Sequence, residues 1–536
     1  MSGLESNALY VGSGSNCEMP SQTDTSVPPS TPAVCRGYSI TSRRADVDWC
    51  WFRLVYASDG GYPFNFAEAA MTDLWRLTAT EVVGKLRKRE LSPLELVEAA
   101  ASRIETVEPK INALPIRFFD QARDYAKHFK NESRNDPGWL AGLPIAVKDY
   151  NDVAGQLTTY GSPIFAEHRA PADDRTIATL RANGAIPLAK SNVPEFAGSH
   201  TFNPVWGITR NPWNLDRTAG GSSGGAAAAL AAGEVWLANG SCLGGSLRIP
   251  ASFCGIVGLR PSPGVVPRGD ALPAFDSLWV DGPMARNVPD LALMLDAMAA
   301  LTQHDPISRS IPPGGFQAVL QRARPPRRIG FSSNFGLRSI DPEVARICRA
   351  GAQRFAKLGC VINEEAPDFS GAIDCFQVLR ALLFADVRGD LLPQERSRIN
   401  PDIVWNIEKG QCLTADEIIR AQRQRNMLFH RVAQFFDDYD LLACPTVAVA
   451  PFPVEQRFPS EIAGEKLTTY IDWMFLTFII TLVGCPAISL PCGLTQDGLP
   501  VGLQLVGRPH GDAELLGAAL LLEQALGFDH CVPLEI

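Results

Sequence analysis

Two short loops rich in glycine and serine carry the residue types in this sequence that could perform nucleophilic chemistry. The first reads Gly-Gly-Ser-Ser-Gly-Gly over residues 220–225, and the second reads Gly-Ser-Cys-Leu-Gly-Gly-Ser over residues 240–246. Glycine permits backbone conformations that other residues avoid, so the second loop could turn successive N–H groups toward one point. Such donors would stabilise the oxyanion that forms when Ser246 attacks a carbonyl carbon. The predicted oxyanion hole consists of the backbone N–H groups of Leu243, Gly244, Gly245 and Ser246.

A serine hydroxyl is a weak nucleophile and needs a base that removes its proton. No histidine lies close to the two loops in the sequence, but a lysine replaces histidine in Ser–Lys variants of the catalytic triad. Lys148 stands at the end of an apolar run, residues 143–147, that is typical of a buried strand. Burial at the end of such a strand would lower the pKa of the lysine toward neutrality, and only a neutral lysine accepts a proton.

Each of these features also has a simpler interpretation. A loop of glycine and serine is commonly only a turn, and a lysine at a strand end is commonly solvated. A phosphate-binding loop would need Gly-Lys-Ser/Thr, and no lysine follows Gly225. Residues 220–224 match the Gly-x-Ser-x-Gly pattern of a nucleophile elbow, but that elbow follows a buried strand and we expect no strand at residues 211–217. The residue pattern alone leaves enzyme and non-enzyme interpretations open.

Over roughly residues 75–530 the sequence resembles the amidase signature family. The matching segments are Gly-Leu-Pro-Ile-Ala-Val-Lys-Asp at 142–149, Lys-Ser-Asn-Val-Pro-Glu-Phe-Ala at 190–197, Thr-Arg-Asn-Pro-Trp at 209–213, the two serine loops, Phe-Cys-Gly-Ile-Val-Gly-Leu-Arg-Pro at 253–261, and Gly-Leu-Pro-Val-Gly-Leu-Gln at 498–504. Their order agrees with that of the family, and so does the spacing of Lys148, Ser222 and Ser246.

The resemblance implies both a catalytic triad and a fold. Lys148 would be the base, Ser222 would relay the proton from a cis peptide bond, and Ser246 would be the nucleophile. The implied fold is α/β, with a mixed central β-sheet sandwiched between helices. The implied reaction is hydrolysis of a carboxamide bond to a carboxylate plus ammonia or an amine, through an acyl-enzyme on Ser246 and with no cofactor.

The second loop departs from the family pattern, which usually reads Gly-Ser/Thr-Asp-x-Gly-Gly-Ser. Cys242 stands at the position of the aspartate. A carboxylate accepts several hydrogen bonds and can hold a loop in place, whereas a thiol is a poor substitute. The departure therefore keeps a weakly active or non-catalytic relative as an alternative. A further alternative is the glutaminase-type subunit of a tRNA-dependent amidotransferase. Cys242 itself is disfavoured as a nucleophile, because no histidine partner is in view.

The elements that must position these residues can be read from capping signals and apolar runs. Capping boxes at Thr78–Glu81 and Ser92–Glu95 predict two helix starts. Residues 185–189 predict a second buried strand, which ends at a second lysine, and residues 226–232 predict an alanine-rich helix. Further on, we expect a strand at 327–332, a helix that begins after Asp341 and runs to Leu358, a strand at 360–362, and short apolar strands over 440–510.

The organisation along the chain is one large domain with a distinct beginning. Residues 1–70 are rich in Ser, Thr, Pro and Gly and are expected to be a disordered or extraneous tail. Residues 71–536 are expected to form the amidase domain, with a helical insertion at about 365–440. The apolar run at residues 473–483 is too short to span a membrane and predicts a buried core segment.

The composition limits the partners. A formal net charge of -9 argues against binding to nucleic acid. The 13 cysteines form no CxxC pair, which favours reduced thiols in a cytoplasmic enzyme, and no metal-ligand spacing is present. We expect a small-molecule amide as the partner, with no nucleic acid, no membrane and no metal. The sequence allows a homodimer but contains no feature that determines the oligomeric state.

Overall fold

The computed structural model describes residues 73–130, 132, 134, 136–269 and 272–527 of the chain. Contacts divide the chain into two units, Met1–Ala69 and Ala70–Ile536, and every described residue belongs to the second. The expected N-terminal tail, residues 1–70, lies outside the described residues.

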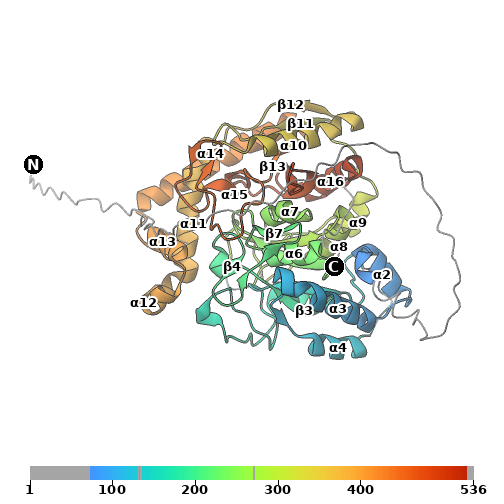
Figure 1. Cartoon of the computed structure of the whole chain (residues 1–536). Helices are drawn as coiled ribbons and strands as arrows, with labels where there is room; N and C mark the ends of the chain where they lie inside the picture. Colours follow the sequence, from blue (N-terminus) through green and yellow to red (C-terminus); the bar gives the residue numbers. More distant parts are fainter. Residues whose placement is uncertain (1–72, 131, 133, 135, 270–271, 528–536) are drawn as a thin grey trace, which may run out of the picture. The chain divides into compact units, whose positions relative to one another are not determined.

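A mixed sheet of 11 strands forms the centre of the second unit (Figure 1). In spatial order its strands are β1 (Ile116–Arg117), β3 (Ile186–Ser191), β2 (Pro144–Lys148), β8 (Leu237–Cys242), β10 (Val280–Ala285), β9 (Val257–Arg260), β16 (Ala487–Leu494), β17 (Pro500–Val506), β13 (Leu441–Pro445), β11 (Arg328–Phe331) and β12 (Val361–Asn363). Strands β3, β2 and β8 run parallel to one another, as do β13, β11 and β12, and the remaining neighbours are antiparallel. The predicted mixed α/β sheet is confirmed.

Helices surround this sheet. They are α2 (Ala79–Arg87), α3 (Pro93–Ile111), α4 (Phe119–His128), α5 (Arg175–Ala182), α6 (Gly224–Ala231), α7 (Arg248–Cys254), α8 (Val288–Met298), α9 (Gly315–Leu320), α10 (Pro342–Ala352), α11 (Ala372–Arg388), α12 (Leu392–Glu395), α13 (Pro401–Gln411), α14 (Ala415–Asp438), α15 (Phe475–Leu482) and α16 (Asp512–Leu526). Both predicted capping boxes are present, with Thr78 capping α2 and Ser92 capping α3. The helix expected from Asp341 to Leu358 ends as an α-helix at Ala352 and continues as 3-10 turns over Gln353–Leu358.

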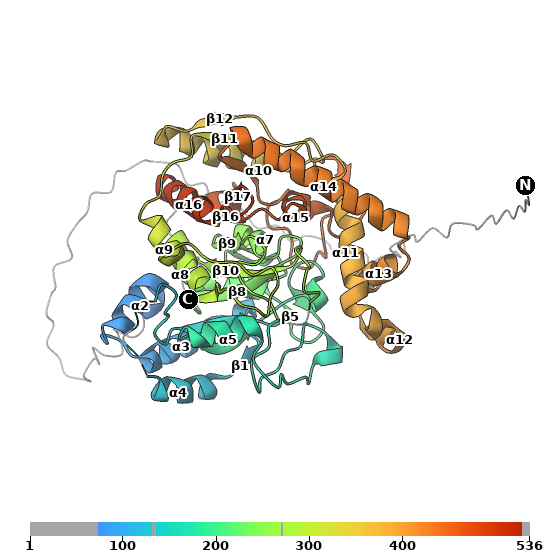
Figure 2. The same ribbon diagram turned by 180° about the vertical axis from the view of Figure 1, so that it is seen from behind.

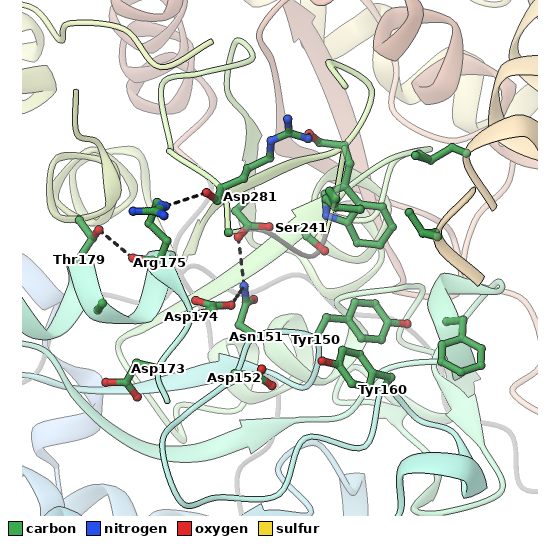
Figure 3. A pocket seen from close by; sticks show the side chains of 18 of the residues that line it. Tyr150, Asn151, Asp152, Tyr160, Asp173, Asp174, Arg175, Thr179, Ser241 and Asp281 are labelled. Carbon is green, nitrogen blue, oxygen red and sulfur yellow. Dashed lines mark hydrogen bonds between the residues drawn. The ribbon is translucent and has the colours of Figure 1, made fainter. Parts of the chain in front are cut away.

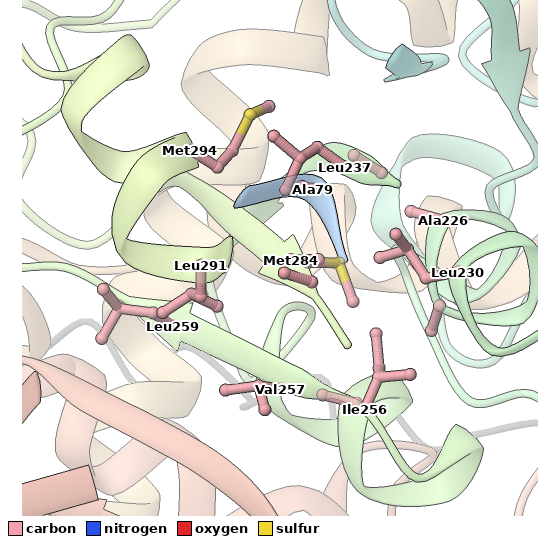
Figure 4. Close-up of a cluster of buried hydrophobic side chains, with 14 of the residues drawn as sticks. Ala79, Ala226, Leu230, Leu237, Ile256, Val257, Leu259, Met284, Leu291 and Met294 are labelled. Carbon is pink, nitrogen blue, oxygen red and sulfur yellow. The ribbon is translucent and has the colours of Figure 1, made fainter. Parts of the chain in front are cut away.

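Two groups of helices enclose the central strands. Helices α6 and α7 pack against each other, while α8 packs against α9 and α16. Figures 1 and 2 show these groups from two sides, and Figure 4 shows side chains of α8 and α6 with those of the strands between them. Leu230 on α6, Leu237 on β8 and Leu291 on α8 are fully buried. Each such side chain contributes about 1.5–3 kcal/mol through its removal from water.

Residues 372–438 are mostly helical, as expected for the segment at about 365–440. Helix α11 packs against α13, α14 and α15, and these helices share a second apolar cluster. The apolar run at residues 473–483 lies within this cluster and includes α15, so the predicted buried segment is confirmed. Among the helices described, none is both long enough and apolar enough to cross a membrane.

One expectation was wrong. The segment at residues 211–217 contains a strand, because β6 (Arg210–Asn211) and β7 (Asn214–Thr218) form an antiparallel hairpin. The side chain of Asn211 accepts the N–H of Trp213 at 3.0 Å and stabilises the turn. Strand β7 is polar, alternates in exposure and lies outside the central sheet, so an expectation based on buried apolar runs missed it. The first serine loop therefore follows a surface hairpin rather than a buried strand.

Candidate active site

Lys148 is the last residue of β2, which lies between β3 and β8 in the sheet. These three strands are parallel, so their carboxyl ends meet at one edge, where open α/β sheets place their ligands. The backbone N–H of Lys148 donates to the Oδ1 atom of Asn239 on β8 at 3.0 Å. The side chain is completely buried. The predicted strand thus delivers the lysine into the interior at the functional edge of the sheet.

Three hydroxyl groups surround the side-chain nitrogen of Lys148. The Nζ atom lies 2.8 Å from the Oγ atoms of Ser222 and Ser223 and 3.0 Å from that of Ser241. The carbonyl oxygen of Ser241 lies 3.3 Å away. A neutral amine has two N–H donors and one lone pair, so a surrounding hydroxyl can donate to the lysine while the others accept from it.

Burial brings the pKa of Lys148 into the neutral range. Removal from water lowers the pKa of Lys148 to about 7, although the nearby Asp281 and Cys242 favour its charged form. A lysine in solution is protonated at this pH and cannot accept a proton. The buried environment that the sequence predicts for Lys148 is therefore present in the structure.

The loop that carries Ser222 approaches other backbone very closely. The peptide bond between Gly221 and Ser222 is cis, in agreement with the resemblance. A Cβ atom at Gly221 would lie 2.3 Å from the carbonyl oxygen of Ser199, so only glycine fits there. Helix α6 begins two residues after Ser222 and packs against β2, β3 and β8. This packing holds the serine beside Lys148.

Ser246 lies in the segment that links the end of β8 to the start of α7. Within the described part of the chain, the backbone N–H groups of residues 243–246 donate to no acceptor. Gly245 has a φ of 139°, and a Cβ there would lie 2.3 Å from the Oγ1 atom of Thr477. The Thr477 hydroxyl donates to the carbonyl oxygen of Gly244 at 2.6 Å and so anchors the segment. An oxyanion hole requires N–H donors that are not already engaged, and these four groups meet that condition.

The two serine loops are joined through the backbone. The N–H of Ser223 donates to the carbonyl oxygen of Ser246 at 3.2 Å. For the residues described, no hydrogen bond links the hydroxyls of Ser222 and Ser246. Catalytic hydrogen bonds are often long without substrate and tighten in the complex. The structure therefore brings Ser222 directly to Lys148 and brings Ser246 beside them through the main chain.

Three residues at this site were not identified from the sequence. Ser223 and Ser241 contact Lys148 directly, and the Tyr150 ring lies 4.8 Å from the lysine nitrogen. The Tyr150 hydroxyl donates to the carbonyl oxygen of Pro194 and also contacts Ser222. Tyr150 follows Lys148 by two residues. Its position just past the end of the strand was the signal from which the sequence could have identified it.

A cavity of about 610 Å³ opens beside this cluster. Tyr150 and Ser241 line it, whereas Ser246 is not among its lining residues. Figure 3 shows Tyr150 and Tyr160 toward one end and Asp173 toward the other. The aromatic part of the lining consists of Tyr150, Tyr160, Phe196, Trp279 and Phe384. The cavity thus reaches the lysine end of the cluster and offers an aromatic wall to a ligand.

Other reactive groups do not compete for this position. Cys242 is fully buried and its sulfur contacts Arg248, with no histidine among its partners in the described residues. His200 is buried beside the rings of Phe202 and Phe452. In the same described ranges, no group of three or more His, Cys, Asp or Glu side chains is arranged to hold a metal ion.

Comparisons with known proteins show which proteins this chain resembles. A family model described as Amidase matches residues 95–516. The chain is 36% identical over 456 residues to an acylamidase of Rhodococcus erythropolis, covering 83% of this chain and 95% of the relative. It is 35% identical over 480 residues to one subunit of the glutamyl-tRNA(Gln) amidotransferase of Moorella thermoacetica, covering 84% of this chain and 97% of the relative.

Solved structures also resemble the described fold. A bacterial aryl acylamidase of the amidase signature family superposes with a TM-score of 0.78 at 28% identity, covering 86% of this chain and 99% of that one. A 6-aminohexanoate cyclic dimer hydrolase, solved with its substrate, also superposes with a TM-score of 0.78 at 28% identity. It covers 85% of this chain and 98% of its own.

Proposed function

The chain belongs to the amidase family, and from that premise we propose that it hydrolyses a carboxamide bond through an acyl-enzyme on Ser246. The products are a carboxylate and ammonia or an amine. The observation that carries the proposal is the buried Lys148 nitrogen, which lies 2.8 Å from the Ser222 hydroxyl. A base kept neutral by burial, next to a hydroxyl relay, is what activation of a serine requires.

The acylation step moves one proton along the relay. Neutral Lys148 accepts the proton of Ser222, and Ser222 accepts the proton of Ser246 as the Ser246 oxygen attacks the amide carbon. The negative charge on the carbonyl oxygen is met by the free N–H groups of residues 243–246. Each such donor stabilises the transition state by roughly 3–4 kcal/mol.

Collapse of the tetrahedral intermediate returns the proton. The C–N bond breaks, and the leaving nitrogen takes a proton from the same relay and departs as ammonia or an amine. A water molecule then attacks the acyl carbon, again with Lys148 and Ser222 as the base. The carboxylate is released, and the Ser246 oxygen regains its proton. No step requires a cofactor.

The cavity supports an amide of small or aromatic character as substrate. Its aromatic wall, described above, can pack against a ring in an edge-to-face or offset manner. The structural neighbour named an aryl acylamidase agrees with this choice. All cysteines among the described residues are free thiols, which supports the cytoplasmic location that we propose.

A second candidate is the glutaminase-type subunit of a tRNA-dependent amidotransferase. Its support is the similarity to the amidotransferase polypeptide of Moorella thermoacetica. A free-standing amidase hydrolyses acetamide, benzamide or an anilide without a partner. A glutaminase of this type instead releases ammonia from glutamine and co-purifies with other subunits. Activity toward glutamine alone, with loss of that activity on removal of a co-purified partner, would favour this second candidate.

The decisive test labels and removes the nucleophile. A fluorophosphonate probe is expected to label the protein at Ser246, and Ser246→Ala is expected to abolish both the labelling and the turnover of the amide panel. Ser252→Ala is a control, because Ser252 lies nearby on α7 but donates no proton in the proposed relay. Unchanged turnover in Ser246→Ala would exclude the assignment.

A further inference from the structure

Cys242 and Arg248 lie at the two ends of the segment that carries Ser246. Cys242 is the last residue of β8 and Arg248 is the first residue of α7, and residues 243–247 connect them. The Sγ atom of Cys242 lies 3.4 Å from the Nη2 atom of Arg248. This contact therefore spans the segment that holds Ser246 and the free N–H donors.

A second guanidinium reaches the same cysteine. Arg260 on β9 donates from Nη1 to the carbonyl oxygen of Cys242 at 2.8 Å and to that of Leu278 at 2.8 Å. Arg248, Arg260 and Cys242 are all completely buried. Two positively charged guanidinium groups thus contact Cys242, at the end of β8, in the protein interior.

Neither arginine has a carboxylate partner within ion-pair distance in the described residues. Arg248 donates to the neutral Oε1 of Gln504 at 2.6 Å and lies 3.5 Å from the hydroxyl of Thr481. The Nε atoms of both arginines have no hydrogen-bond partner in that part of the chain. Two buried guanidinium groups without an anion would carry a large desolvation cost.

The other acidic groups nearby are already engaged. Asp276 forms an ion pair with Arg268 at 3.4 Å, and Asp281 accepts hydrogen bonds from Asn151 and Thr176. Cys444 accepts a hydrogen bond from Gln504, and burial raises the pKa of its thiol to about 12. Among these acidic side chains, Cys242 is the one that contacts the guanidinium of Arg248.

We propose that Cys242 is a thiolate in the working enzyme. Its charge holds Arg248 and so positions the backbone N–H donors of residues 243–246. Cys242 thereby takes over the task of the carboxylate that the family usually has at this position. It is a positioning residue, because its sulfur is directed at the arginine and not at the hydroxyls of the relay. The kinetic part of this inference rests on the proposed amidase function, whereas the charge of the sulfur does not.

The electrostatic surroundings agree with this inference. Burial alone would raise the pKa of the Cys242 thiol, but the charges of Arg248 and Arg260, together with hydrogen bonds from Arg248 and from the backbone of Leu247, lower it to about 7. Lys148, on the neighbouring strand, adds a positive charge when it is protonated. Asp281 on β10 is paired with Ser241 and interacts with Lys148. Because the folded pKa lies below the ordinary thiol value, the thiolate is present above about pH 7 and is lost as the pH falls through that value.

The first experiment compares Cys242→Asp with Cys242→Ser. Aspartate keeps the negative charge, whereas serine has a similar size but no charge at this pH. We expect Cys242→Asp to retain kcat within about threefold and Cys242→Ser to lose about 100-fold, with KM changed much less, since a small misplacement of catalytic groups costs about that much. Cys254→Ser is the matched control, because Cys254 is equally buried but burial alone raises the pKa of its thiol.

The pH profile separates a charge effect from a packing effect. In the natural protein both Lys148 and Cys242 must be deprotonated, so activity should fall steeply on the acid side of about pH 7. In Cys242→Asp only Lys148 titrates there, so the acid limb should become shallower. A merely structural role of the cysteine would leave the steepness unchanged.

An optical measurement tests the charge without any assay of activity. The ultraviolet difference spectrum between the natural protein and Cys242→Asp should contain a thiolate band that disappears as the pH is lowered through about 7. The difference spectrum for Cys254→Ser should lack such a band. The inference would be overturned by absence of the band at pH 8, or by full activity of Cys242→Ser. If no variant and no natural protein hydrolyses any amide, the proposed function fails, while the spectrum still decides the state of the sulfur.

Discussion

The side-chain nitrogen of Lys148 lies 2.8 Å from the hydroxyl oxygen of Ser222, and both side chains are shielded from solvent. The contact joins the end of a central strand to a glycine-rich loop that enters from outside the sheet. A lysine in water would be charged, whereas here burial lowers the pKa of Lys148 to about 7, which suits its proposed role as the base. The proposed chemistry depends on this pair, and the following expectations depend on it or on the elements that hold it.

Replacement of the relay serine should be far more damaging than replacement of its neighbour. Ser222 and Ser223 lie equally close to Lys148, but the proposed relay passes the proton of Ser246 through Ser222 alone. We expect Ser222→Ala to lower kcat by a factor of roughly 10⁴ and Ser223→Ala by about tenfold. Steady-state kinetics on one amide measures both. Equal losses in the two variants would contradict the assigned relay.

Activity should rise with pH on the acid side of neutrality. Burial lowers the pKa of Lys148 to about 7, so the lysine is protonated and inactive below that pH and neutral above it. We expect kcat/KM to fall by at least about tenfold per pH unit below pH 7 and to level off above it. Circular dichroism over the same range serves as the control for unfolding. A flat profile between about pH 6 and pH 8 would show that Lys148 is not the base.

Thr477, which anchors the segment of residues 243–246, should affect kcat more than KM. Thr477→Val removes the hydroxyl that donates to the carbonyl oxygen of Gly244 and retains the side-chain volume. We expect kcat to fall about tenfold and the free energy of unfolding to fall by about 1 kcal/mol. Thr446→Val is the control, since Thr446 bonds Ser489 in the sheet interior. The same kcat loss in both variants would argue against a specific anchor.

The aromatic wall of the cavity should select aromatic amides. Trp279 lines the cavity, and its ring centroid lies 6.2 Å from that of Tyr150. We expect Trp279→Ala to raise KM for benzamide or an anilide by about tenfold, because stacking area is lost, and to leave KM for acetamide nearly unchanged. Acetamide is the internal control on the same variant. An equal change for both substrates would place the aromatic group elsewhere.

Asp290 should be a stability residue without a role in the reaction. Its buried carboxylate accepts the backbone N–H groups of Ala79 and Thr80 at 2.8 Å and so ties the start of α2 to α8. We expect Asp290→Ala to lower the free energy of unfolding by about 2–4 kcal/mol in urea titrations, because the N–H groups at the start of α2 and the buried amide of Asn287 lose their acceptor. Asp216→Ala on the polar hairpin strand β7 is the control. A large loss of kcat at a temperature where Asp290→Ala remains folded would contradict this expectation.

Much of the architecture could be predicted from local patterns. Two capping boxes mark α2 and α3, and two apolar runs that end in lysine mark β2 and β3. Such features depend on residues close in sequence, so their physics is local. The hairpin of β6 and β7 was missed because its strands are short and polar, and its stability depends on turn hydrogen bonds rather than an apolar run.

The sequence by itself determined which residues are candidates for the chemistry. Lys148, Ser222 and Ser246 follow from their loops, their order and their resemblance to a known pattern. Only the tertiary structure decided what surrounds them. Lys148 meets Ser241 of the second loop from a separate strand, and Thr477 contacts that loop from a helix that no local rule pairs with it. The same holds for Cys242, which the sequence presents as a missing carboxylate and the fold places against two buried arginines. The reason is physical, because the pKa of a lysine or a thiol depends on desolvation and on charges brought close by packing, and neither is encoded in its immediate neighbours.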